Sequence, residues 1–211
     1  MNPNIPRVAV CIPSGDLVHA DMAMNMLAMG ASCRDLIVSG HNCKREVITK
    51  ARNKLVREAL ENPEVTHVLF VDSDHMFPMD GLRQLIRRDK EIVGCFYEKR
   101  QAPYGIAGEF AESHIDVMKD TGLKRAVIIP GGFILVRRDV YEKLSPPWYR
   151  EIYTEYGKIA ANPDGLMSED TYFCKSAHEA GLELWCDLDL SRQIWHMGTQ
   201  HVPFGAHLQN A

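Results

Sequence analysis

Short apolar runs alternate with amphipathic stretches through the first half of the chain. The apolar runs cover residues 7–12, 36–39, 67–71 and 92–97. Between them, apolar positions recur at helical spacing over residues 19–29, 45–60 and 78–88. Strands that alternate with helices over short connections favour a mostly parallel sheet with right-handed crossovers, which is an α/β fold.

The second half of the chain is less regular. Its pattern predicts strands over residues 126–130, 133–136 and 183–187, a short helix from residue 138 and a helix over 168–180. Residues 98–125 read as irregular, 145–165 as a long ordered loop, and 194–211 as loop. Because no internal repeat or linker interrupts the sequence, we expect residues 1–211 to form a single domain, with halves at 1–97 and 98–211.

The third apolar run ends abruptly in Asp72-Ser73-Asp74. In open α/β sheets, ligands bind beyond the carboxyl ends of the strands. If strand geometry continues, Asp72 and Asp74 face the same side, and two close carboxylates repel each other unless a cation lies between them. Carboxylate oxygens suit Mn2+ or Mg2+, so the motif predicts a divalent metal site. The alternative is a loop whose aspartates cap the next helix.

Composition narrows the function classes. The net charge is −4, which argues against a general polyanion-binding surface, although Arg83, Arg87, Arg88 and Lys90 form a local basic cluster that could contact nucleic acid. No apolar run reaches membrane-spanning length and no signal peptide is evident, so we expect a cytoplasmic protein without a transmembrane segment. The six cysteines lack metal-ligand spacing and are predicted to be reduced core thiols.

The order and spacing of six motifs resemble those of GT-A glycosyltransferases, in particular the inverting family 2 type. The motifs are Val10–Ser14, Ala51–Asn53, Val71–Asp74, Gly131–Phe133, Ser168–Asp170 and Trp195–His196. The resemblance implies a GT-A, Rossmann-like sheet flanked by helices. Residues 1–97 would bind a nucleotide-sugar donor, and residues 98–211 would form the acceptor and catalytic half.

The resemblance also implies where a UDP- or GDP-sugar would lie. His41-Asn42 occupies the place where the family often has an acid that reads the base, so the identity of the nucleotide stays open. Position within the helix alone would favour solvent for Arg52 and Asn53, whereas the family pattern puts Arg52 near the base or diphosphate. The implied donor-binding residues are Pro13, Ser14, Asp16, Asn42, Arg52, Asp72, Ser73, Gly131 and Gly132.

The resemblance assigns the metal mainly to Asp74, with Asp72 near the ribose and the metal. His196 would supply a nitrogen, which favours manganese somewhat. His201 is a competing ligand, and His196 could instead be a core or loop histidine. A divalent ion on the leaving diphosphate would stabilise the negative charge that develops there.

The acceptor hydroxyl needs a general base, and the acid pair Glu169-Asp170 at a predicted helix start can provide one. Neighbouring helical residues point about 100° apart, so one acid serves while the other packs. The resemblance favours Asp170. The alternative is that both acids only complement the helix dipole. Gly131-Gly132 would let the backbone approach the donor sugar, or form an ordinary turn.

The combined prediction is a metal-dependent hexosyltransferase, with a retaining mechanism as an alternative. A sugar-nucleotidyltransferase is disfavoured, because the loop at residues 13–16 is short and acidic rather than glycine-rich and basic. A non-catalytic module that binds a carbohydrate or partner remains a distinct hypothesis. The acceptor could be a glycan, a protein or a modified nucleic acid base, and the oligomeric state is open. Trp148, Tyr149, Tyr153 and Tyr156 could form an acceptor platform or a small core.

Overall fold

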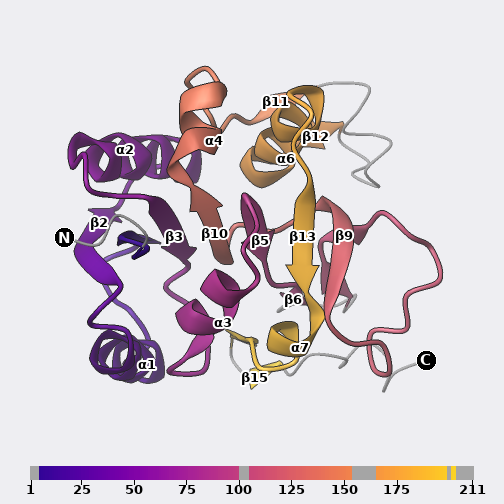
Figure 1. Cartoon of the computed structure of the whole chain (residues 1–211), viewed down its shortest axis with the longest axis horizontal. Helices are drawn as coiled ribbons and strands as arrows, with labels where there is room; N and C mark the ends of the chain where they lie inside the picture. Colours follow the sequence, from indigo (N-terminus) through magenta and orange to yellow (C-terminus); the bar gives the residue numbers. More distant parts are fainter. Residues whose placement is uncertain (1–4, 100–104, 154–164, 199–200, 203–211) are drawn as a thin grey trace.

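The computed structural model describes residues 5–99, 105–153, 165–198 and 201–202 (Figure 1). An eight-stranded sheet with the order β2-β1-β3-β10-β5-β13-β9-β8 runs through the molecule. Strand β1 (Val8–Ser14) pairs in parallel with both β2 (Ile37–Lys44) and β3 (His67–Val71). These three strands reproduce the parallel arrangement that the alternating pattern predicts.

Strand β10 (Phe133–Arg137) lies antiparallel between β3 and β5 (Ile92–Gly94). A strand from the second half of the sequence therefore separates two strands of the first half. Strand β13 (Leu184–Asp187) pairs in parallel with β5, and β9 (Leu123–Ile128) and β8 (Glu109–Phe110) follow antiparallel to their neighbours. Since only β10 and β9 run against the common strand direction, the predicted mostly parallel α/β sheet is confirmed.

Helices cover both faces of the sheet (Figure 1). They are α1 (Ala20–Ser32), α2 (Ile48–Glu61), α3 (Gly81–Arg87), α4 (Arg138–Lys143), α6 (Glu169–Glu179) and α7 (Leu188–Ser191). In β3, Val68 and Phe70 pack into one core with residues of α2, α4 and α6, whereas Leu69 and Val71 pack into a second core with α1, α3 and α7. This alternation is what a strand buried on both faces produces.

Short strand pairs complete the fold where the sequence predicts loop. Strand β14 (Trp195–Met197) pairs with β4 (His75–Met76) and with β15 (His201–Val202), so the loop predicted over 194–211 is wrong for these residues. Two further pairs are β6 (Tyr97–Glu98) with β7 (Ile106–Ala107) and β11 (Ile152–Tyr153) with β12 (Leu166–Met167). Strands of two or three residues leave no periodic signal, because alternation becomes visible only over about four residues or more.

Strand β2 continues to Lys44, beyond the predicted end at Ser39. It pairs with β1 along its length, up to Ser14 opposite Lys44, and this pairing holds Gly40, His41 and Asn42 in an extended conformation. The tertiary partner thus overrides the polar local sequence.

Buried side chains agree with several expectations. The six cysteines are free and buried, as predicted. Trp148 and Tyr149 are buried, which favours the small-core interpretation for them, whereas Tyr153 is exposed and Tyr156 lies outside the described residues. Within the described ranges, no helix combines the length and the apolar character that crossing a bilayer requires.

Candidate functional site

Asp72 begins the site immediately after β3. Its backbone N–H donates to the carbonyl oxygen of Gly132 over 2.9 Å, which extends the pairing of β3 with β10 by one residue. Its carboxylate accepts from Nη2 of Arg52, at 3.0 Å to Oδ1 and 3.3 Å to Oδ2. Both oxygens of Asp72 are therefore engaged by a cation of the protein itself.

Arg52 connects Asp72 to the second half of the chain. Its Nε donates to Oε1 of Glu169 over 3.2 Å, and its Nη1 donates to the carbonyl oxygen of Gly131 over 3.2 Å. The side chain is 2% exposed, so the expectation that it faces solvent is wrong. Burial alone would lower the pKa of Arg52, but Asp72 and Glu169 outweigh it and raise the pKa, which keeps the guanidinium charged.

Asn53 is also buried, contrary to the solvent expectation. Its Oδ1 accepts from the backbone N–H groups of Trp148 and Tyr149, at 2.8 and 3.3 Å. Its Nδ2 donates to the carbonyl oxygens of Thr49 and Tyr149, at 2.6 and 2.8 Å. The two middle residues of α2 thus have separate roles: Arg52 holds the carboxylates and Asn53 holds the segment before β11.

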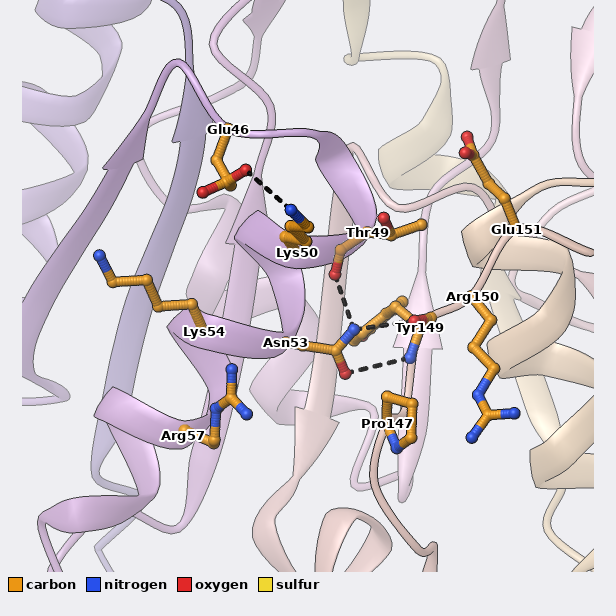
Figure 2. Close-up of a pocket in the computed structure, with 10 residues that line it drawn as sticks. All are labelled: Glu46, Thr49, Lys50, Asn53, Lys54, Arg57, Pro147, Tyr149, Arg150 and Glu151. Atoms are coloured by element: carbon orange, nitrogen blue, oxygen red, sulfur yellow. Dashed lines mark hydrogen bonds and ion pairs between the residues drawn. The ribbon is translucent and has the colours of Figure 1, made fainter.

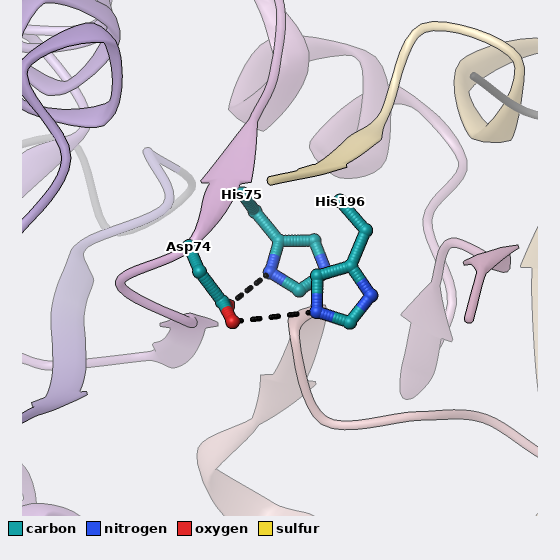
Figure 3. A group of neighbouring side chains, drawn as sticks. All are labelled: Asp74, His75 and His196. Atoms are coloured by element: carbon teal, nitrogen blue, oxygen red, sulfur yellow. Dashed lines mark hydrogen bonds and ion pairs between the residues drawn. The ribbon is translucent and has the colours of Figure 1, made fainter. Parts of the chain in front are cut away.

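The chain turns at Ser73 instead of continuing as a strand, so strand alternation does not set where Asp74 lies. The backbone N–H of His75 donates to the carbonyl oxygen of Asp72 over 3.3 Å, which closes this turn. The premise that strand geometry continues through Asp74 is therefore wrong, although Asp72, Ser73 and Asp74 all line one cavity. In its own position, Asp74 faces two imidazoles (Figure 3).

Asp74, His75 and His196 form a cluster that could hold a metal ion. Oδ1 of Asp74 lies 3.2 Å from Nδ1 of His75, and Oδ2 lies 3.3 Å from Nε2 of His196. One ligand atom from each residue lies within 4.8 Å of the others. Burial would raise the pKa of Asp74, but hydrogen bonds from His196 and His75 outweigh it and lower the pKa well below its usual range.

Whether the cluster fits a metal depends on the second ring nitrogen of each histidine. Nδ1 of His196 lies 3.0 Å from the carbonyl oxygen of Glu98, which can accept an N–H from that nitrogen, while Nε2, the nitrogen that faces Asp74, would bind the metal. This is the arrangement that metal-ligating histidines use. Nε2 of His75 is buried without a hydrogen-bond partner among the described residues, and the His75 ring stacks on His196 at 4.6 Å. One oxygen and two nitrogens suit Mn2+ better than Mg2+.

The sequence interpretation did not include His75 in the metal site, and its metal assignment for Asp72 stays a prediction. His75 is buried within a polar motif, and the pairing of β4 with β14 brings it opposite His196. The only signal for His75 in the sequence is its position directly after the Asp-x-Asp motif. The side chain of His201 is outside the described part of the structure, so its competing assignment stays a prediction.

Gly131 and Gly132, which directly precede β10, leave room for neighbouring side chains of this protein. A Cβ on Gly131 would lie 2.5 Å from Nη2 of Arg52, and a Cβ on Gly132 would lie 2.6 Å from the Tyr97 hydroxyl and 2.8 Å from Nε2 of His75. The N–H of Gly132 also donates to the Tyr97 hydroxyl over 3.1 Å. The glycines are thus required by internal packing, and their contact with a donor remains a prediction.

Glu169 and Asp170 separate at the start of α6, as neighbouring helical residues must. Glu169 is buried against Arg52, and burial, followed by the charge of Asp170, raises its pKa despite the guanidinium. Asp170 lines a cavity of about 280 Å³ together with residues of β7, β8 and β12. The structure therefore gives the pair unequal positions, with Asp170 at the cavity.

Asp170 is held in place through one of its oxygens. Its Oδ1 accepts from the hydroxyl of Ser168 and, over 2.7 Å, from the backbone N–H of Thr171. Ser168 occupies the position before α6. Its hydroxyl interacts with the side chains of Asp170 and Thr171 rather than with a backbone amide. Oδ2 of Asp170 has no hydrogen-bond partner among the described residues.

A second cavity, of about 320 Å³, lies in front of Asp72-Ser73-Asp74. Pro13 and Ser14 line its other wall, as the resemblance implies, and Arg45 joins them. Arg45 was missed by the sequence interpretation. It forms an ion pair with Asp16, and its backbone N–H donates to the carbonyl oxygen of Ser14 over 3.0 Å.

Asn42 lies beside this cavity. Its Nδ2 donates to the carbonyl oxygen of Ile12 over 2.8 Å and to the hydroxyl of Ser14 over 2.9 Å. The side chain is exposed and its amide oxygen remains available. The structure therefore brings Asn42 and Ser14 together at the carboxyl ends of β1 and β2.

The basic cluster proposed for nucleic acid is largely neutralised. Arg83 donates to Asp35 and to the carbonyl oxygen of Ser32. Arg88 binds Asp187 at 2.7 Å and Asp189 at 3.3 Å, and Lys90 lies 4.4 Å from the ring centre of Trp185. Arg87 is exposed and forms no ion pair in the described part of the chain. Arg87 and Lys90 are thus the two members without a carboxylate partner among the described residues, and two cations give little basis for a phosphate-binding surface at this place.

The sequence matches no known family profile and no curated protein sequence. Among solved structures, the chain is similar to A197 from STIV, with a TM-score of 0.60, 14% identity and 94% of each chain covered. It is also similar to GalNAc-T7 solved with UDP, GalNAc and Mn2+, with a TM-score of 0.52, 11% identity and 96% of this chain covered. The match spans 45% of the GalNAc-T7 chain. The shared fold is GT-A-like.

Proposed function

We propose that the protein is a metal-dependent glycosyltransferase that moves a hexose from a UDP- or GDP-sugar to an acceptor hydroxyl. The observation that carries the proposal is the separation of two sets of side chains at one edge of the sheet. Asp74, His75 and His196 form a potential metal site beside the Pro13–Ser14 cavity, and Asp170 borders a different cavity. A donor and an acceptor require two such sites.

The donor would occupy the cavity in front of Asp72-Ser73-Asp74. Pro13, Ser14 and Asn42 would contact the nucleoside, and the pairing of β1 with β2 fixes them together. Arg45 borders the same cavity and could approach the diphosphate once it leaves Asp16. An exposed ion pair of this kind costs little to break.

Asp74, His75 and His196 would hold the divalent cation, and their donor set favours Mn2+. When bound, the cation would supply positive charge to the diphosphate as it leaves. In this proposal Asp72 contributes through Arg52 rather than as a direct ligand, because both of its oxygens already accept from the guanidinium.

Asp170 would act as the general base. The acceptor oxygen attacks the anomeric carbon, the bond from that carbon to the diphosphate breaks, and the nucleoside diphosphate leaves with the electron pair. The hydroxyl proton passes to Oδ2 of Asp170, while Oδ1 stays fixed by Ser168 and Thr171. A single displacement of this kind inverts the anomeric centre. Base catalysis contributes on the order of 10²–10⁴ to the rate.

The proposal is tested by incubating the protein with a panel of UDP- and GDP-sugars and Mn2+, with and without chelator. We expect slow release of nucleoside diphosphate from at least one donor, and its loss when the metal is removed. If no donor gives chelator-sensitive release, the enzyme proposal is wrong and a non-catalytic binding module becomes the better explanation. Analysis of the product's anomeric configuration then distinguishes inversion from retention.

A further inference from the structure

A groove of about 580 Å³ lies outside the two cavities of the proposed active site. One wall is the outer side of α2, and the other is the segment from Pro147 to Glu151 (Figure 2). Asn53 joins the two walls through three hydrogen bonds to Trp148 and Tyr149. The groove is therefore built on a rigid floor.

The groove is rich in positive charge although the chain has a net charge of −4. Lys50, Lys54 and Arg57 follow one another along α2, and Arg150 belongs to the other wall (Figure 2). Lys50 and Lys54 form only exposed ion pairs, at 4.0 Å to Glu46 and 3.8 Å to Glu58. Such pairs contribute little, so these lysines remain available to a ligand.

Arg57 and Arg150 are exposed and form no ion pair within the residues that the structure describes. The guanidinium of Arg150 lies 5.7 Å from the ring centre of Tyr172, which orients it. Two unpaired arginines across one groove suit carboxylate or phosphate groups, because each guanidinium can donate two parallel hydrogen bonds.

The charge is polarised along the groove. Glu46 and Glu151 lie at the end near the start of α2, and Arg57 lies at the opposite end (Figure 2). Glu46 also lines the Pro13–Ser14 cavity, so the acidic end is the one next to the proposed donor site. An occupant should therefore carry its negative charges at the far end only.

This polarity favours a polypeptide over a uniformly charged polymer. Nucleic acids and sulfated polysaccharides carry negative charge on every unit, and Glu46 and Glu151 would repel part of such a chain. The groove also offers no open ring for a base to stack on, since Tyr149 is 3% exposed and stacks on Phe173 at 5.0 Å. Lys50 and Arg57 are two helical turns apart, about 10 Å, which three extended residues span.

We infer that the groove between α2 and Pro147–Glu151 binds a polypeptide segment with acidic residues, whose carboxylates meet Lys54, Arg57 and Arg150. The inference goes beyond the proposed function and does not depend on it, because binding needs neither donor nor metal. If both hold, the groove presents an acidic protein segment next to the donor site.

The test measures the affinity of the full chain for a short fluorescent peptide with three consecutive glutamates at one end and neutral residues at the other, by anisotropy, without donor or metal. We expect binding that weakens as salt increases. Arg57→Glu combined with Arg150→Glu should weaken it roughly tenfold or more, because two charge contacts are reversed. The matched control is Arg87→Glu, another exposed arginine without an ion pair in the described part of the chain, which should change the affinity less than about twofold.

Labelled oligodeoxythymidine and heparin serve as competing probes. Absence of peptide binding, an equal loss in the control variant, or tighter binding of oligodeoxythymidine or heparin at the same arginines would overturn the inference. If the double variant is unfolded by circular dichroism, Arg57→Gln and Arg150→Gln replace it and should each give a smaller loss in the same direction. Failure of donor hydrolysis with intact peptide binding would contradict only the proposed function.

Discussion

Arg52 and Glu169 are 117 positions apart in the chain, yet Nε of Arg52 donates to Oε1 of Glu169 over 3.2 Å in the interior of the protein. The same guanidinium holds Asp72 at 3.0 Å. One buried cation therefore joins the end of β3 to the start of α6. Through Glu169 it also fixes the backbone that presents Asp170 to its cavity.

Replacing Arg52 with methionine should destabilise the protein by about 3–5 kcal/mol, because Asp72 and Glu169 would lose the charge that compensates their burial. Urea denaturation measures the change. Arg57→Met on the same helix is the control, and since Arg57 is exposed, its effect should stay within about 0.5 kcal/mol. Equal stability of the two variants would mean that the ion pairs of Arg52 with Asp72 and Glu169 contribute nothing to the free energy of unfolding.

Substitution of the proposed metal ligands should weaken Mn2+ binding even when no nucleotide sugar is present. His196→Ala and Asp74→Asn should each weaken Mn2+ binding by at least tenfold, because each removes a direct ligand atom of the cluster. Calorimetric titration with Mn2+ checks this. His75→Asn should also weaken Mn2+ binding if His75 is a ligand in place of Asp72. Unchanged Mn2+ affinity would show that His75 does not belong to the metal site.

Asp170→Asn should reduce the rate of transfer by a factor on the order of 10²–10⁴, while Mn2+-dependent donor binding stays near the wild-type value. Asp74→Asn should abolish transfer and weaken donor binding as well. Donor affinity and turnover, measured separately for both variants, test this division of roles. Equal losses of donor affinity would contradict it.

Gly132→Ala should disturb the site although it removes no functional group. The new Cβ would lie 2.6 Å from the Tyr97 hydroxyl and 2.7 Å from Cε1 of His75, so something must shift. We expect a loss of about 1–3 kcal/mol in stability together with weaker Mn2+ binding. Gly40→Ala in β2 is the control, because no atom lies within 4 Å of its new Cβ.

His67 should make stability depend on pH. Burial, followed by the charge of Arg137, lowers the pKa of His67 from 6.5 to about 4. The unfolded chain therefore binds a proton as the pH falls through 6.5, whereas the folded chain does not until about pH 4. Stability should fall across this window as the pH decreases, by up to about 3 kcal/mol.

Urea titrations between pH 7 and pH 4 measure this dependence. His67→Asn should flatten the slope, because the titrating group is gone. His114→Asn replaces a histidine whose side chain is 79% exposed and should leave the slope unchanged. A wild-type slope that His67→Asn does not alter would assign the pH dependence to other groups.

Local patterns in the sequence were sufficient for the main elements of the fold. The runs at residues 7–12 and 67–71 correspond to β1 and β3, and the periodicity over 45–60 corresponds to α2. Apolar periodicity reports which residues of one element are buried, and this burial is the same for any partner. The sequence therefore determined the α/β class and the place of Asp72 to Asp74 at a strand end.

Only the tertiary structure decided which elements meet. The antiparallel insertion of β10 between β3 and β5 has no local signal, because a buried apolar strand accepts either direction and several neighbours. The same holds for β4 and β14, whose pairing brings His75 opposite His196.

Among the features that the sequence did not predict, the turn at Ser73 changes the arrangement of the site most. In sequence, Asp72 and Asp74 look equivalent, but the turn sends one carboxylate to Arg52 and the other to the two imidazoles. The sequence determined which residues carry the chemistry, since only these side chains can bind a metal or move a proton. The tertiary structure decided their partners, because contacts between residues as far apart as Arg52 and Glu169 depend on how the whole chain packs.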